Sequence, residues 1–182
     1  DYPNGSKNTG IRYVALDTET SGLHPKQGAE IVQFGYTVYD SQGNRLYSKS
    51  YDIRPETKNP DGTYYTGPPE AVAVHGIEHD RAVKADPFPK VWEKVVPDLQ
   101  GSVIIGHNLS FDTGQIRQQL LNHRIKNPDG EQLRTEQVWQ GEIDTLKYAA
   151  RHIHHTENRK LVTLAAEYDI VLENAHDAGD DA

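Results

Sequence analysis

Two acidic residues stand two positions apart early in the chain, in the string Leu16-Asp17-Thr18-Glu19. The apolar run before them predicts a strand. Because alternate side chains of a strand point to the same face, Asp17 and Glu19 are expected to lie close together. Like charges that close raise each other's pKa unless a cation lies between them, and carboxylate oxygens favour Mg²⁺ or Mn²⁺ over zinc. The pair predicts either a divalent-metal site or, because so short a pattern is common by chance, a solvated strand end.

A third acid, Asp112, ends the string GHNLSFD that spans residues 106–112. The string follows a predicted buried strand and opens a predicted helix. Asp112 is therefore expected in the first helical turn at the carboxyl end of the sheet, where ligands gather in open α/β sheets. The alternative is an acid that only complements the helix dipole, an effect of about 0.3–1 kcal/mol.

A histidine and a fourth acid, His176 and Asp181, stand five positions apart near the end of the chain. Residues with this spacing do not share a helical face, so His176 is expected on a loop or helix start and Asp181 further inside the helix. A fixed metal ligand with a more mobile base beside it would suit that arrangement. The alternative is an acidic, disordered chain end.

The elements that position these residues are predicted from hydrophobic periodicity. Strands are expected at 12–17, 32–38, 46–53 and 103–106 and again from Ile143, and helices at 91–99, from Ser110 to before Asn127, after Ile143 and at 161–168. The first three strands are joined by short connections, which predicts an antiparallel meander. A meander followed by alternating strands and helices predicts an α/β fold, with a mixed sheet flanked by helices.

Composition sets limits on the class of protein. The 182 residues suit one globular domain, and 35% hydrophobic and 25% charged residues exclude a disordered chain. Without cysteine there is no thiolate metal site, and no apolar run approaches the roughly 20 residues of a membrane helix, so a cytoplasmic protein is expected. The net charge of −8 argues against a nucleic-acid binder unless a local basic strip exists or divalent cations neutralise an acidic cleft. Polar residues 1–10 predict a leader or linker, and the start at Asp1 predicts a processed or excised segment, such as one domain of a longer chain.

The three acidic strings resemble, in order, the three exonuclease motifs of the DEDDh (DnaQ-like) family, which includes the proofreading epsilon subunit of DNA polymerase III. Three further segments, at 69–77, 143–146 and 161–165, are similar to other parts of the family pattern. A sister class has a tyrosine four residues before the last acid. Asp177 stands there in this chain, which indicates the histidine class.

The resemblance implies an RNase H-like mixed sheet of five strands, in a domain over 11–182 that lacks its final helix. It implies a metal-dependent 3′→5′ exonuclease that hydrolyses single-stranded nucleic acid, DNA in preference to RNA, to nucleoside 5′-monophosphates. Two divalent cations, Mg²⁺ or Mn²⁺, would be held by Asp17, Glu19, Asp112 and Asp181, with His176 as general base. The implied partner is a polymerase or another domain of a longer chain. The resemblance implies no binding to a membrane.

The resemblance also implies contacts with the terminal nucleotide, from Thr20, Leu23, Glu70, His75 and Asn108. Phe111 is either core or a stacking surface, and core is favoured. Tyr64 and Tyr65, on a loop expected to be exposed, touch either substrate or nothing. Lys147, Arg151, Arg159 and Lys160 form either a basic strip for a nucleic-acid strand or a solvated helix face. The histidine-rich tract at 152–155 is expected to be an exposed loop and not a metal site.

Two other functions fit parts of the sequence. The first is a catalytically silent exonuclease-like binding or interaction module, whose sign would be a broken acidic set; here all four acids and the histidine are present. The second is an RNase H-type endonuclease, which also uses clustered acids with two metals but lacks this combination of motifs. Activity on a circular substrate would distinguish the endonuclease.

Overall fold

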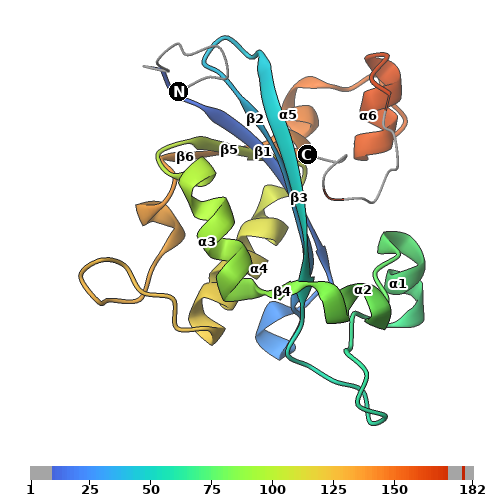
Figure 1. Ribbon diagram of the computed structural model, residues 1–182. Helices are drawn as coiled ribbons and strands as arrows, with labels where there is room; N and C mark the ends of the chain where they lie inside the picture. Colours follow the sequence, from blue (N-terminus) through green and yellow to red (C-terminus); the bar gives the residue numbers. More distant parts are fainter. Residues whose placement is uncertain (1–9, 172–177, 179–182) are drawn as a thin grey trace.

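The computed structural model describes residues 10–171 and residue 178 (Figure 1). Its centre is a six-stranded sheet with the order β4-β3-β2-β1-β5-β6. Strands β1 (Tyr13–Thr20), β2 (Ile31–Tyr39) and β3 (Arg45–Arg54) form an antiparallel meander, and β5 (Val103–Gly106) and β6 (Gly141–Asp144) continue the sheet in parallel beside β1. The predicted mixed sheet is confirmed.

The sixth strand, β4 (Asp86–Pro87), corrects the expected count of five. It pairs in parallel with Ile53 and Arg54 at the end of β3. Proline has no N–H to donate, so it is confined to sheet edges and strand ends. Two residues that include a proline leave no strand pattern in the sequence.

Helices lie on both sides of the sheet: α3 and α4 on one side, α5 and α6 on the other (Figure 1). The α-helices are α1 (Pro69–His75), α2 (His79–Lys84), α3 (Phe88–Leu99), α4 (Leu109–Asn122), α5 (Thr145–His152) and α6 (Leu161–Glu167), and two 3-10 turns cover Pro25–Gln27 and Thr135–Gln137. The last four α-helices match the predicted ones. The sequence did not predict α1 and α2, because each is too short for a periodic apolar pattern.

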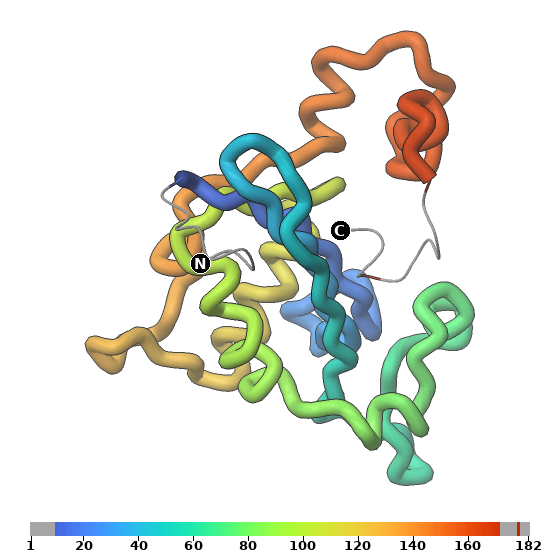
Figure 2. The backbone as a smooth tube through the Cα atoms, turned by 45° about the horizontal axis from the view of Figure 1, so that its top comes forward, coloured from blue at the N-terminus to red at the C-terminus, as the bar shows by residue number. Residues whose placement is uncertain are grey.

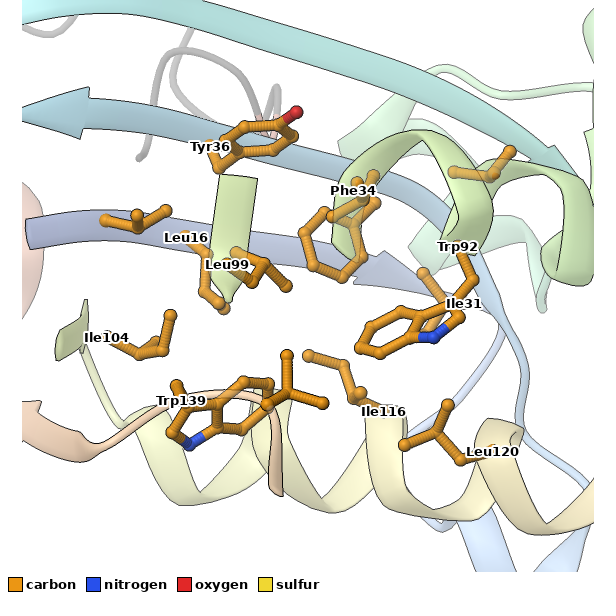
Figure 3. Close-up of a cluster of buried hydrophobic side chains, with 14 of the residues drawn as sticks. Leu16, Ile31, Phe34, Tyr36, Trp92, Leu99, Ile104, Ile116, Leu120 and Trp139 are labelled. Atoms are coloured by element: carbon orange, nitrogen blue, oxygen red, sulfur yellow. The ribbon is translucent and has the colours of Figure 1, made fainter. Parts of the chain in front are cut away.

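The main core fills the space between the sheet and the helices α3 and α4 (Figure 3). Leu16 of β1, Phe34 of β2 and Ile104 of β5 face Leu99 and Ile116 of the two helices. Every residue of β2 from Ile31 to Val38 is buried. The acid-bearing strand β1 is therefore held between a fully buried neighbour and β5, which fixes its position.

The loop at 55–68 and α1 lie to one side of the sheet, and the segment at 123–140 lies to the other (Figure 2). Tyr64 is half-buried in the first loop, which corrects its expected exposure. Its ring centroid lies 5.7 Å from that of His79, and the ammonium of Lys58 lies 5.0 Å from the Tyr64 centroid. Tyr64 therefore stabilises the loop itself.

Candidate functional site

Asp17 and Glu19 extend from the same face of β1, as the alternation predicted. Val14, Leu16 and Thr18 are buried on the other face, towards the main core, whereas Asp17 and Glu19 are half-buried. In the ladder with β2, Asp17 lies opposite Gly35 and Glu19 lies opposite Gln33. The strand thus presents two carboxylates together at its carboxyl end.

Asp112 meets this pair through Thr18, the residue between the two acids. Its Oδ1 accepts hydrogen bonds from the Thr18 backbone N–H at 2.9 Å and from the Thr18 hydroxyl at 2.7 Å. The pairing of β5 with β1 extends only to Ala15, so the edge of β1 beyond that point is left to the first turn of α4. Asp112 takes the place of a neighbouring strand there, beside the residue that separates the two acids of β1.

The environment of Asp112 is unfavourable for a negative charge. Its side chain is only 2% exposed. Burial raises the pKa of Asp112 to about 6, and the hydrogen bonds from Thr18 only partly oppose this effect. The carboxylate of Asp144 also raises the pKa of Asp112. A buried carboxylate of this kind is stabilised in its charged form by a cation.

Asp144 fixes the first residues of two helices next to the site, α4 and α5. Its Oδ1 accepts hydrogen bonds from the backbone N–H groups of Leu146 and Asn108, at 3.0 and 3.1 Å. It therefore caps α5 and also fixes Asn108, which adopts a left-handed conformation with φ 63° just before α4. This role was not predicted, although an aspartate between a strand and a helix is a common N-cap signal.

The fourth acid and the candidate base, Asp181 and His176, lie outside the described residues. Ala178, between them, is described and fully buried. Its backbone N–H donates to Oε1 of Gln33 at 2.9 Å, and Gln33 is the cross-strand neighbour of Glu19. A residue between His176 and Asp181 is therefore held beside the first acidic pair. Nothing in the sequence distinguished Gln33 from the other residues of its strand.

The Gln33→Met variant is expected to lower turnover about 10–100-fold while the protein stays folded. The substitution removes the acceptor for the Ala178 N–H, and a small misplacement of reacting groups can cost this much. Steady-state kcat and KM, together with thermal unfolding, would measure the effect. Thr37→Val is the matched control, because Thr37 is buried on the same face of β2 and bonds Ser48 at 2.6 Å, far along the strand from Glu19. An unchanged kcat in Gln33→Met would contradict a positioning role.

The loop after β1 carries Thr20 and Leu23, two of the predicted substrate contacts. The carbonyl of Gly22 accepts hydrogen bonds from the Thr20 hydroxyl at 2.9 Å and from Nε2 of the buried Gln115 at 3.1 Å. Leu23 is nevertheless 72% exposed. A rigid loop that exposes a large apolar side chain is suited to packing against a base.

The segment with Glu70 and His75 lies next to this loop. Gly67, just before α1, packs so closely on Ser21 that an added Cβ would lie 3.4 Å from the Ser21 backbone, and its φ of 136° disfavours any side chain. Glu70 is exposed in the first turn of α1. His75 is buried instead: its Nδ1 accepts from the Ile77 N–H at 3.0 Å, and burial lowers the pKa of its imidazole. Their contacts with substrate stay predictions.

The structure also places the remaining residues that the sequence singled out. Phe111 is half-buried, between its two predicted roles. His154 and His155 are exposed, as expected for the histidine tract, and His155 pairs with Glu167 at 2.9 Å. Over residues 10–171 and 178, no three histidine or acidic side chains come close enough together to hold a metal ion. Within the same residues, no helix is long and apolar enough to span a membrane.

Fold and site together define the class of the protein: a mixed α/β domain with acidic side chains at the carboxyl end of its first strand and in the first turn of α4. The Exonuclease family model matches residues 14–182, and the chain belongs to that family. The predicted exonuclease family is confirmed.

Three known proteins illustrate the similarity. The 3′-5′ exonuclease DinG of Bacillus subtilis is 28% identical over 172 residues, which are 94% of this chain and 16% of DinG. A DNA polymerase III subunit epsilon-like protein of Rhodobacter capsulatus is 30% identical over 120 residues, which are 65% of this chain and 16% of that protein. The nuclease domain of 3′hExo, a DEDDh family member solved with bound rAMP, shares the fold with a TM-score of 0.72 at 16% identity, covering 97% of this chain and 88% of that one. The chain spans about a sixth of the length of these two curated relatives.

Proposed function

We propose that this domain removes nucleotides one at a time from the 3′ end of a single-stranded nucleic acid by metal-dependent hydrolysis. The observation that carries the proposal is the hydrogen-bonded contact of Asp112 with Thr18, because it fixes a third carboxylate against the strand segment that bears Asp17 and Glu19. The residues from 11 to 182 would form one exonuclease domain of a longer protein, in which a polymerase or another domain is the partner.

The donor set fits divalent cations. All three carboxylates offer hard oxygen atoms, which suit Mg²⁺ or Mn²⁺. Both bonds from Thr18 go to Oδ1 of Asp112, so they leave Oδ2 for another partner. We assign Asp17, Glu19, Asp112 and Asp181 as the residues that hold the metal, two ions in all. Bound there, divalent cations lower the pKa of water and stabilise charge on a departing oxygen.

The side chains of the domain would do the remaining work. His176 accepts the proton of the attacking water, which is the usual role of a histidine with a pKa near neutral pH. Leu23 packs on the terminal base, and Thr20, Glu70, His75 and Asn108 hold the terminal nucleotide. The product is a nucleoside 5′-monophosphate. The name of the epsilon-like relative supports DNA as the preferred substrate, and the rAMP bound to the structural neighbour supports a site that also accepts RNA.

Matched 5′-labelled DNA and RNA strands should be shortened stepwise from the 3′ end when Mg²⁺ or Mn²⁺ is present, with DNA shortened faster. Excess EDTA should abolish the reaction, since the carboxylates then lack their cation. A strand with a blocked 3′ end and a closed circle are the controls, and both should survive. Efficient cutting of the circle would indicate the endonuclease instead. Binding without hydrolysis would indicate the silent module.

A further inference from the structure

A groove of about 350 Å³ lies between the start of α4 and the helix α5. Ser110, on the first turn of α4, lines one side, two positions before Asp112. Asp144, at the end of β6, also lines the groove. Four residues from two successive turns of α5 complete the lining. The groove therefore includes Asp144, whose charge acts on Asp112, and it lies along β6, the outer strand of the sheet.

The α5 side of the groove is both basic and aromatic. Its residues stand at one-turn spacing, so they share a helix face: they are Lys147, Tyr148, Arg151 and His152. Tyr148 is 59% exposed, and its ring centroid lies 4.4 Å from that of His152 with the planes 35° apart. Ala149 is the buried residue of α5, so this face does not serve the core.

The groove is lined by two acids, Glu142 and Asp144, and by two bases, Lys147 and Arg151. Oε1 of Glu142 already accepts from Trp139 Nε1 at 3.0 Å and pairs with Arg117 at 3.2 Å. Lys147 lies 3.6 Å from Oδ2 of Asp144, a side chain that is only 10% exposed and that already caps α5. Arg151 is exposed and forms no ion pair with any acid among residues 10–171. Arg159, by contrast, donates to the carbonyl of Ile153 at 3.3 Å. Of the basic strip considered from the sequence, Lys147 and Arg151 line the groove.

We propose that this groove binds the part of the single-stranded substrate that lies on the 5′ side of the terminal nucleotide. A base stacks on Tyr148 and His152, and the phosphates pair with Lys147 and Arg151. Exposed aromatic rings next to basic side chains are the usual surface for an unpaired strand, because bases offer ring faces and the backbone offers charge. The inference rests on the proposed exonuclease function and explains how a chain of net charge −8 holds a polyanion.

Oligo-dT and oligo-U of 2 and 12 nucleotides, labelled at the 5′ end, would test the groove. Arg151→Glu and Tyr148→Ala are expected to raise KM for the 12-mers, with kcat unchanged and the dinucleotides hydrolysed as by the wild type. Loss of one stacked base should weaken binding of the 12-mer about fivefold or more. Loss of one phosphate contact should reduce the slope of log Kd against log salt by about 0.7.

Lys90→Glu is the matched control, because Lys90 is an exposed lysine of α3, on the other side of the sheet. It should leave KM for both lengths within about twofold, as for a screened surface charge. Equal KM values for wild type and both groove variants on the 12-mers would overturn the proposal that the groove binds the substrate strand. So would an increase of the same size in Lys90→Glu. If the wild type hydrolysed neither length, the proposed function would fail, and anisotropy with the 12-mers would still show whether the groove variants bind more weakly.

Discussion

The Asp112→Asn variant is expected to lose nuclease activity and yet to be more stable than the wild type in the absence of metal. Asparagine keeps the Oδ1 that accepts both hydrogen bonds from Thr18, so the position of α4 is retained. It removes a charge that we assign to cation binding. Losing several kcal/mol of metal-assisted stabilisation of the transition state lowers the rate by roughly 10³-fold or more.

The gain in stability follows from the raised pKa of Asp112, which is about 6 against an ordinary 3.8. The folded protein holds this proton more tightly than the unfolded chain, so the stability from the group is full below pH 3.8 and is lost as the pH rises through about 6. Asparagine does not titrate and avoids the loss. The free energy of unfolding of the variant should exceed that of the wild type by about 1–3 kcal/mol above pH 6.

Thermal unfolding in EDTA at several pH values between 4 and 8 would measure this difference. It should be small at pH 4, grow up to about pH 6 and then stay constant. Added Mn²⁺ should stabilise the wild type more than the variant. Asp129→Asn, at an exposed loop position, is the control and should show none of these changes. A variant that is less stable than the wild type at pH 7.5 in EDTA, or that retains activity, would rule out this account of Asp112.

The parts of the site that local patterns determine could be predicted from the sequence. The alternation along β1 placed Asp17 and Glu19 on one face, and the apolar run followed by GHNLSFD placed Asp112 in the first turn of α4. Both predictions depend only on backbone periodicity. The same rule failed for β4 and for α1 and α2, because elements of two, seven and six residues are too short for an apolar pattern to recur.

The contacts that join these parts could not be predicted, because they connect residues far apart in the chain. Thr18 and Asp112 are separated by 94 positions, and Gln33 and Ala178 by 145. The sequence shows Gln33 only as a polar residue in a largely apolar strand. Its role becomes visible once its partner Ala178 is known. His75 shows the converse case: its family pattern suggested a substrate contact, whereas burial and two backbone partners give it a structural role as well.

The His176→Ala variant is expected to lose turnover by roughly 10²–10⁴-fold, the usual contribution of a general base. Substrate and metal binding should change little, because all four carboxylates remain. The hydrogen bond of Ala178 to Gln33 supports this role, since it holds the chain two residues after His176 beside the strand position of Glu19.

The pH dependence of kcat separates a base from a residue that only shapes the loop. A base must be neutral to accept a proton, so the rate of the wild type should rise with pH through the titration of His176, and this rise should be absent in the variant. Water activated by a divalent cation also titrates near neutral pH, so the comparison between the two proteins carries the conclusion. His155→Ala, at an exposed histidine paired with Glu167, is the control and should keep both the rate and the pH profile. Near-normal turnover in His176→Ala, or the same rise with pH, would remove His176 from the mechanism and leave the cation as the only activator of the attacking water.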